Sequence, residues 1–325
     1  MTVSRRDFLH LAACGAAFSI VPHSAWAQAY PDHPVRIIVP VAAGGATDII
    51  GRLIGQWLSE RMGQPFVVEN RPGAGGNIGT EAVIRSAPDG YTLLLIQAGN
   101  VINTSLYDNL RFNFLKDVAP VVVISRPPFL MAVHPSIPAR TVPEFITYAN
   151  ANRGKVNMAS AGVGTGNHVA GELFKMLTGI QMVHVPYRGG GPALIDLMAG
   201  QVQVMFGSTP SMVQYVRSGA LRPLAVTTTV RSDILPNVPT VAESVPGYEA
   251  SDLYGIAAPK GTPPAVVDRL NKEVNAWLND EAVKKKLADL GGMTTGGTSV
   301  YAGELIASET EKWAKVVKFS GAKAE

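Results

Sequence analysis

Cysteine is nearly absent from this sequence: Cys14 is the single example among 325 residues, and it lies in an N-terminal stretch typical of an export signal. Once that stretch is removed, the chain has no thiol. This excludes disulfide bonds, thiolate metal sites and a cysteine nucleophile. A cysteine-free chain is also at no disadvantage in an oxidising compartment.

Charge is also scarce. Asp, Glu, Lys and Arg together make up 16% of the residues, whereas hydrophobic residues make up 46%. This balance favours a sizeable core over disorder, and the length suits two domains. The formal net charge is +3, without a block of basic residues beyond the extreme N-terminus. Since nucleic-acid binding needs a clustered basic face, we expect no nucleic-acid partner.

The glycine motifs of nucleotide-binding proteins are incomplete here. The sequence has no G-x-x-x-x-G-K-[ST] motif. The G-x-G-x-x-G pattern fails at its sixth position, which is Ile78 when counted from Gly73 and Asn167 when counted from Gly162. Both motifs need their full residue set to cradle phosphates. We therefore expect no nucleotide cofactor.

Signatures of hydrolases and metal sites are equally incomplete. Ser160 follows a predicted strand, but a nucleophile elbow needs glycine two residues earlier, where this chain has Met158. His168 and Glu172 have the four-residue spacing of metal ligands on a helix, yet no H-E-x-x-H motif accompanies them. We expect neither a catalytic residue nor a metal or other cofactor.

Residues 1–27 are typical of a signal peptide. Residues 4–9 (SRRDFL) resemble a twin-arginine signal, residues 9–21 are apolar, and residues 25–27 (AWA) have the small-x-small form of a cleavage site. The apolar stretch is shorter than the roughly 20 residues that span a bilayer. We predict export to the periplasm with cleavage near Ala27. Lipidation at Cys14, which ends a lipoprotein-like box, is an open alternative.

Strand-like and helix-like patterns alternate after the signal. Apolar runs typical of buried strands cover residues 36–41, 66–68, 91–96, 121–124, 130–133, 156–159, 182–185, 202–206 and 224–227. Helical spacing is clearest at residues 50–58, 167–177, 192–199, 264–279 and 300–317. This alternation predicts an α/β protein with largely parallel sheets.

One supersecondary plan occurs twice, about 120 residues apart. Residues 36–76 and residues 156–192 each run strand, glycine loop, helix, strand and arginine-glycine loop. The spacing is too long for a solenoid and indicates two similar lobes. We predict that domain 1 comprises residues 28–127 and 251–325, and that domain 2 comprises residues 128–250. The chain then crosses between them near residues 125–128 and 248–254.

The first loop of each copy is suited to binding an anion. A strand that passes through glycines into a helix leaves backbone N–H groups free at the positive end of the helix dipole. We expect Thr47 or Asp48 to cap the helix of the first copy, beginning near Ile49, and Thr165 or Asn167 to cap that of the second. If the lobes face each other, both loops meet in one cleft.

These motifs resemble the periplasmic receptors of tripartite tricarboxylate transporters, also called Bug receptors. The segments that carry the resemblance occur in order through nearly the whole chain after the signal: residues 40–48, 70–79, 87–93, 160–165, 185–190 and 224–227. The resemblance implies a two-lobed α/β periplasmic-binding-protein-like fold of type II, with a small carboxylated or amide solute in the cleft between the lobes. It further implies a monomeric, non-enzymatic receptor that serves the large and small membrane subunits of such a transporter.

The resemblance also implies the ligand-binding residues. The loops 43–48 and 160–168 are expected to embrace the ligand, with residues 97–100 and the strand end at Gly207 nearby. Receptors of this type often have a polar or acidic residue where this chain has Gly207, which leaves the contribution of that loop open. The full expected set is Ala43, Gly44, Gly45, Thr47, Asp48, Gln97, Ala98, Asn100, Ser160, Ala161, Gly162, Gly164, Thr165, His168, Gly207 and Ser208.

Alternatives remain at this stage. Arg71 and Arg188 each precede a glycine-rich turn, and we expect them to brace those loops rather than to bind ligand. Two competing functions stay open: a sensor that passes its ligand to a signalling partner, and an enzyme of the same two-lobed form. The sequence does not name the ligand, because backbone donors are generic.

Overall fold

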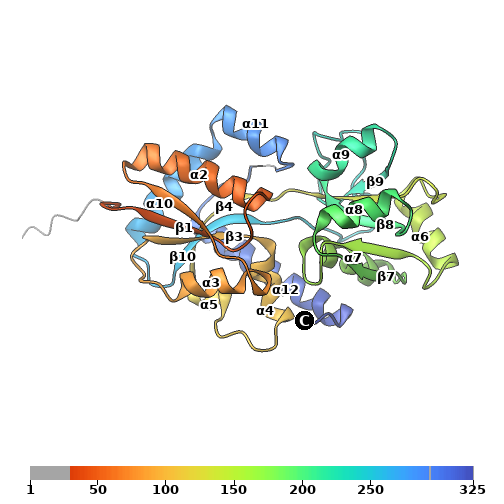
Figure 1. Cartoon of the computed structure of the whole chain (residues 1–325), viewed down its shortest axis with the longest axis horizontal. Coiled ribbons are helices and arrows are strands. Elements are labelled where there is room, and N and C mark those ends of the chain that lie inside the picture. The colour runs from red at the N-terminus through yellow and green to blue at the C-terminus, as the bar shows by residue number, and fades with distance from the viewer. Residues whose placement is uncertain (1–29, 293, 325) are drawn as a thin grey trace, which may run out of the picture. The chain divides into compact units, whose positions relative to one another are not determined.

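Two five-stranded sheets form the framework of the chain in the computed structural model (Figure 1). The structure describes residues 30–292 and 294–324. The chain separates into Met1–Asp32 and His33–Glu325, and all described helices and strands belong to the second unit. Of the first unit only residues 30–32 are described, so the expected signal peptide lies outside the described residues.

The first sheet has the strand order β2-β1-β3-β10-β4. Its strands are β1 (Val35–Val39), β2 (Phe66–Asn70), β3 (Thr92–Ile96), β4 (Val118–Ser125) and β10 (Tyr254–Pro259). The second sheet has the order β7-β6-β8-β5-β9. Its strands are β5 (Phe129–Val133), β6 (Asn157–Ser160), β7 (Val183–Pro186), β8 (Val204–Ser208) and β9 (Arg222–Val226). The parts of the chain built on these sheets are called the first lobe and the second lobe below.

Both sheets are mixed, so the expectation of largely parallel sheets was wrong. β1 pairs in parallel with β2 and β3, and β6 with β7 and β8. β10 is antiparallel to β3 and β4, and β5 is antiparallel to β8 and β9. The reason is topological. β5 and β10 each enter their sheet directly from the other lobe, so they start at the edge where β3 and β8 end.

The helices follow the strands along the chain. The longer ones are α2 (Ala46–Met62), α4 (Ala98–Leu106), α6 (Val142–Ala151), α7 (Gly166–Thr178), α8 (Gly190–Met198), α9 (Thr209–Arg217), α10 (Pro264–Leu278), α11 (Glu281–Asp289) and α12 (Ser299–Ser320). Shorter segments are α3 (Asn77–Ile84), α5 (Phe114–Asp117), and the 3-10 turns η2 (Ala74–Gly76) and η3 (Val241–Glu243). No helix in the described ranges is both long and apolar enough to cross a bilayer.

The predicted repeat is confirmed. β1-α2-β2-α3-β3 and β6-α7-β7-α8-β8 follow the same order along the chain, and their strands occupy equivalent places in the two sheets. The two-lobed α/β architecture that the repeat predicted is therefore the observed one.

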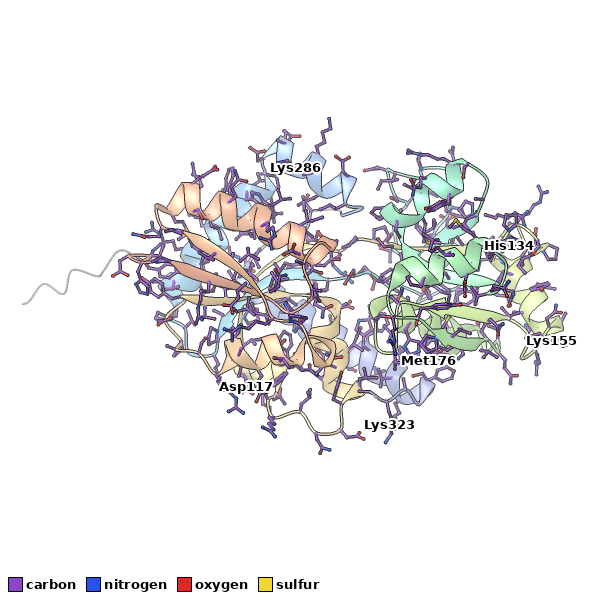
Figure 2. All side chains as sticks on the ribbon, viewed as in Figure 1. Asp117, His134, Lys155, Met176, Lys286 and Lys323 are labelled. Carbon is purple, nitrogen blue, oxygen red and sulfur yellow. The ribbon has the colours of Figure 1, made fainter. Side chains whose placement is uncertain are left out.

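Apolar side chains fill the space around both sheets. Every residue of β3 and β5 is buried, as expected for strands covered on both faces. α12 packs on α4 and β4 of the first lobe and on α7 of the second. Its Trp313 belongs to the same buried cluster as Phe174 of α7. Charged side chains such as Lys155, Lys286 and Lys323 project outward instead (Figure 2).

Two crossing segments, one short and one long, connect the lobes. Residues 126–128 lead from β4 to β5, and the stretch after β9 returns to β10. The crossings lie side by side, since the N–H of Asp252 donates to the carbonyl of Pro127 at 2.9 Å and Pro128 bridges to Ser251. Both therefore pass the edge where the parallel strands end.

Candidate functional site

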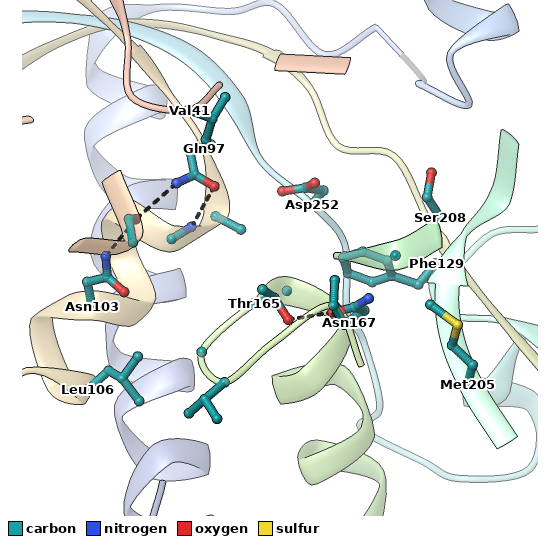
Figure 3. Close-up of a pocket in the computed structure, with 18 of the residues that line it drawn as sticks. Val41, Gln97, Asn103, Leu106, Phe129, Thr165, Asn167, Met205, Ser208 and Asp252 are labelled. Carbon is teal, nitrogen blue, oxygen red and sulfur yellow. Dashed lines mark hydrogen bonds between the residues drawn. The ribbon is translucent and has the colours of Figure 1, made fainter. Parts of the chain in front are cut away.

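A cavity of about 430 Å³ lies where the ends of the two sheets face each other (Figure 3). Residues of both lobes and of the second crossing line it. They are Val41, Gly75, Gln97, Ala98, Gly99, Asn103, Leu106, Tyr107, Phe129, Ala161, Val163, Gly164, Thr165, Gly166, Asn167, Gly190, Met205, Ser208, Ser211 and Asp252. This is the place where open α/β sheets usually bind ligands, beyond the carboxyl ends of their strands.

The second-lobe wall of the cavity begins with the glycine loop between β6 and α7. Gly162 and Gly164 have φ values of 136° and 74°, a region that residues with a side chain rarely adopt. The loop folds back on itself, because the Thr165 hydroxyl donates to the carbonyl of Gly162 at 2.6 Å. These turns bring the backbone of the loop to the cavity, together with the side chains of Thr165 and Asn167 (Figure 3).

Three helices of the second lobe point uncapped N-termini at this wall. Thr165 is the N-cap of α7, Gly189 that of α8 and Ser208 that of α9, and none of the three makes a side-chain capping bond. Gly166, Gly190 and Ser211, from the first turns of these helices, line the cavity. First-turn N–H groups and the helix dipole both favour negative charge. The second-lobe wall is therefore suited to an anion.

The capping expectations are only partly met. Thr165 does precede α7, but its hydroxyl is turned to the Gly162 carbonyl and to Asn167 Oδ1, so the expected cap by Thr165 or Asn167 was wrong. α2 begins at Ala46, with Gly45 as its N-cap, so the expected start near Ile49 was also wrong. In the α7 loop the Thr165 hydroxyl bonds within the loop instead. At α2, Thr47 and Asp48 lie inside the first turn of the helix, so neither is the cap that we expected.

The first-lobe wall has a different character. Gln97 forms a capping box at the start of α4: its Oε1 accepts from Gly99 N–H at 3.3 Å, and its own N–H donates to Asn100 Oδ1 at 2.8 Å. The side-chain amides of Gln97 and Asn103 both donate to the Gly75 carbonyl, at 3.4 and 3.0 Å (Figure 3). The polar groups of this wall are thus largely used within the protein.

Asp252, in the second crossing, is the charged side chain among the lining residues. Its carboxylate accepts hydrogen bonds from the Tyr254 hydroxyl and from Leu253 N–H, each at 2.9 Å, and from the N–H of Ala98 at the start of α4. Burial raises the pKa of this carboxyl group above its ordinary value. The sequence predicted a crossing in this segment but gave no sign that Asp252 would line the cavity.

Asp48 is held within the first glycine loop. Its carboxylate accepts from Arg52 at 3.0 Å, and also from Gly44 N–H and the Asn70 amide, each at 3.0 Å. The hydrogen bond from Arg52 is the largest cause that lowers the pKa of Asp48. The bonds from Gly44 and Asn70 lower this pKa further, whereas burial raises it. The carboxylate therefore braces the loop, and its charge is balanced locally by Arg52.

Of the sixteen residues expected to bind ligand, some line the cavity and the others lie outside its lining. Those that line the cavity are Gln97, Ala98, Ala161, Gly164, Thr165 and Ser208. Those outside the lining are Ala43, Gly44, Gly45, Thr47, Asp48, Asn100, Ser160, Gly162, His168 and Gly207. Several residues of the second set support the lining indirectly. Thr47 is hydrogen-bonded to the Tyr254 hydroxyl, and Asn100 belongs to the capping box of α4.

His168 and Ser160 support the second-lobe loop from behind. His168 is buried, and its Nδ1 accepts from Gly164 N–H at 3.1 Å. Its ring stacks on that of His184 at 3.8 Å between centroids, and His184 Nε2 lies 2.6 Å from Ser160 Oγ. Burial above all lowers the pKa of His168 to about 3 and that of His184 to about 4. Both rings are therefore neutral at ordinary pH.

The two arginines differ. Arg71 bonds Glu69 of β2 at 2.6 Å, so its partner lies in the preceding strand and not in the glycine-rich turn that we expected it to brace. Arg188 lines a neighbouring cavity of about 390 Å³, and it makes no hydrogen bond or ion pair to the residues that the structure describes, so it does not brace its loop as expected. Within the described ranges, no group of three or more His, Cys, Asp or Glu side chains is placed to hold a metal ion.

The energetics of such a cavity fit a small anion. Burying a carboxylate costs several kcal/mol unless it is hydrogen-bonded, and each charge-assisted hydrogen bond returns roughly 1.5–3 kcal/mol. Four or five backbone and hydroxyl donors thus offset the cost without a basic side chain. Micromolar affinity needs only about 8 kcal/mol net.

The chain is similar to a defined family of proteins. The family model described as "Tripartite tricarboxylate transporter family receptor" matches residues 50–321. Protein BugT of Bordetella pertussis is 37% identical over 300 residues, which cover 91% of this chain and 92% of BugT.

Solved structures of similar proteins have the same fold. R. palustris Rpa4515 with adipate matches with a TM-score of 0.79 and 36% identity, covering 90% of this chain and 99% of that one. MatC from Rhodopseudomonas palustris with bound malate matches with a TM-score of 0.76 and 32% identity, covering 89% and 100%. The first of these structures is of the protein with adipate, and the second is of the protein with bound malate.

Proposed function

This chain belongs to the tripartite tricarboxylate transporter receptor family, and we propose that it captures a small organic acid in the periplasm and delivers it to the large and small membrane subunits of a tripartite transporter. The observation that carries the proposal is the second-lobe wall. The uncapped N-termini of α7, α8 and α9 meet at one cavity whose lining has no basic side chain.

The family consists of solute-binding receptors and not of enzymes. The cavity fits that role. Ser160 is fully buried and hydrogen-bonded to His184, so it does not face the cavity as a nucleophile would. A receptor needs only to surround its ligand and release it. Backbone hydrogen-bond donors on the two lobes can bind a ligand in this way without any catalytic group.

The proposed ligand contacts come from both lobes. Gly164, Thr165, Gly166 and Asn167 of the α7 loop, with Ser208 and Ser211 at α9, would surround the carboxylate. Gln97, Ala98 and Asp252 would meet the other end of the solute. The remaining expected residues, Asp48 and His168 among them, would act by holding the two loops in shape.

The lobes are proposed to be domains that close by a hinge at the two crossings. The proposed bounds are residues 28–127 with 251–325 for domain 1, and residues 128–250 for domain 2. Two-lobed receptors commonly close around a ligand in this way. Closure fits this cavity, because the uncapped helices stand on one side and Asp252 with α4 on the other.

Export to the periplasm is proposed from the N-terminal sequence, with cleavage near Ala27. A chain that carries its solute to membrane subunits has no need of a second copy, and we propose a monomer. Delivery to a transporter is preferred to signalling because the family is named for its transporter.

Binding of carboxylates by the protein without residues 1–27 tests the proposal. Calorimetric titrations with four- to six-carbon carboxylates, each beside the uncharged diol of the same length, would give the affinities. We expect dissociation constants in the micromolar range or below for at least one carboxylate, and none for its diol. Binding of no carboxylate, or equal binding of the diol, would refute a carboxylate receptor.

A further inference from the structure

We propose that Asp252 determines the specificity of this receptor, by selecting a carboxylate whose far end carries a hydrogen-bond donor, such as a primary amide, over a dicarboxylate. The inference rests on the proposed function, because it assumes that one carboxylate of the ligand meets the second-lobe wall. It adds the chemistry required at the opposite end of the same ligand.

The two walls of the cavity have opposite electrical character. The second-lobe wall carries the positive ends of α7, α8 and α9. The opposite side carries the carboxylate of Asp252, and the lining includes no Lys, Arg or His to balance it. A ligand that spans the cavity therefore meets an anion-binding surface at one end and a negative charge at the other.

Asp252 is held firmly in this position. Its own N–H donates to Pro127 in the first crossing at 2.9 Å, and its carboxylate accepts from Leu253, Tyr254 and Ala98. Tyr254 is in turn hydrogen-bonded to Thr47 at the start of α2. A rotation of the carboxylate away from the cavity would break these bonds, so the position of the carboxylate in the site is fixed.

The carboxylate retains the capacity to accept one more hydrogen bond. Two ionised carboxylate oxygens offer about four lone-pair sites, and the three donors named above use three. An ionised carboxylate can accept but cannot donate. The group of a ligand that satisfies the remaining site must therefore be a donor, and a second ligand carboxylate would be repelled.

The rest of the first-lobe wall offers a second ligand carboxylate little compensation. The N-terminus of α4, the natural anion site on this side, is already occupied by Asp252 at Ala98 and by Gln97 at Gly99. The Asn103 amide donates both to the Gly75 carbonyl and to Asn77 Oδ1, each at 3.0 Å, so both of its N–H groups are used. The donors left on this wall, the second N–H of the Gln97 side-chain amide and the Tyr107 hydroxyl, are neutral and do not balance a second ligand charge.

Matched pairs of ligands test the proposal. Succinate, glutarate and adipate each have a half-amide of nearly the same shape: succinamate, glutaramate and adipamate. Affinities for the six compounds would be measured by calorimetry at pH 7.5, where the amide is uncharged. We expect the half-amide of the best-fitting pair to bind at least tenfold more tightly than its dicarboxylate, since facing like charges in an interface are strongly unfavourable.

Two variants that each remove one negative charge show whether the ligand preference depends on Asp252. Asp252→Asn should abolish or reverse the preference, whereas Asp268→Asn, at an exposed position of α10 outside the cavity lining, should leave the ratio unchanged. A mere bracing role would weaken both members of a pair equally. That result, or a wild-type preference for the dicarboxylate, would overturn the proposal.

The outcomes separate this inference from the proposed function. Binding of dicarboxylates with equal or higher affinity than half-amides would refute the role of Asp252 and leave the carboxylate receptor standing. Binding of none of the six compounds would refute both. Should Asp252→Asn fail to fold, as judged by circular dichroism, the ratio in the wild-type protein alone decides the proposal.

Discussion

Gly164, at the tip of the second-lobe loop, lies directly against Leu106, at the end of α4 in the first lobe. A Cβ atom at position 164 would stand only 2.1 Å from Leu106 Cδ2, far inside van der Waals contact. The backbone at Gly164 also has a φ of 74°. The close approach of the two lobes at this point therefore depends on the absence of a side chain.

We predict that Gly164→Val lowers ligand affinity at least hundredfold while the protein still folds, because the valine holds the loop away from α4. The matched control is Gly154→Val. Gly154 has nearly the same φ, 73°, but nothing lies within 4 Å of its Cβ position. Both variants strain the backbone alike, and only the first should lose binding in calorimetry. Equal loss in both would show that backbone strain, and not contact between the lobes, is responsible.

The ion pairs at the crossings should contribute to stability. Arg126 in the first crossing bonds Glu249 in the second at 3.0 Å and Glu309 of α12 at 2.8 Å, and Lys312 also bonds both acids. Arg126→Met leaves two partly buried carboxylates with one cation. We expect a loss of about 3 kcal/mol in the free energy of unfolding, measured by urea titration.

The control for this prediction is an exposed pair. Arg85 bonds Glu81 on the helix surface at 2.6 Å, with 64% of the Arg85 side chain exposed. Arg85→Met should cost less than about 1 kcal/mol, as surface ion pairs usually do. Similar losses in the two variants would contradict a special role for the network at the crossings.

Stability should fall as the pH is lowered from 7 to 5. The pKa of His168 is about 3 in the folded chain, whereas its ordinary value is 6.5. Below pH 6.5 His168 becomes protonated in the unfolded chain but stays neutral in the folded chain. Lowering the pH therefore stabilises the unfolded state relative to the folded state. The free energy of unfolding changes by roughly 1.4 kcal/mol per pH unit for each such group. His168 alone should therefore lower the free energy of unfolding by on the order of 2 kcal/mol at pH 5.

His168→Gln tests this sign and its cause. Glutamine can still accept from Gly164 N–H but does not titrate. The free energy of unfolding of the variant, compared at pH 7 and pH 5, should fall by roughly 2 kcal/mol less than that of the wild type. Parallel curves for the two proteins would mean that His168 keeps its ordinary pKa in the folded chain.

The local patterns of the sequence predicted most of the regular structure. The apolar runs at 130–133 and 91–96 correspond to β5 and β3, and the spacing at 264–279 to α10. These elements are found because burial on a sheet or one helix face imposes a period on the sequence. α4 was missed, since its polar residues Asn100 and Asn103 face neighbouring protein groups and blur that period.

The site was predicted less completely, for a physical reason. The glycine loop before α7 was identified because glycine at a strand end has few other uses. Asp252 carries no such local mark: an acidic residue in a connecting segment is ordinary. Its importance arises only when β10 returns to the first sheet antiparallel to β3 and brings Asp252 to the N-terminus of α4. Strand pairing between residues so far apart in the sequence cannot be predicted from the pattern of any single segment.

The most direct test of a carboxylate receptor with these two walls is a crystal structure with the tightest-binding carboxylate of the titrations. We expect the ligand carboxylate within hydrogen-bond distance of the first-turn N–H groups of α7 or α9, with the other end of the ligand beside Asp252. A carboxylate bound elsewhere, for example on the unpaired Arg188 in the neighbouring cavity, would contradict it.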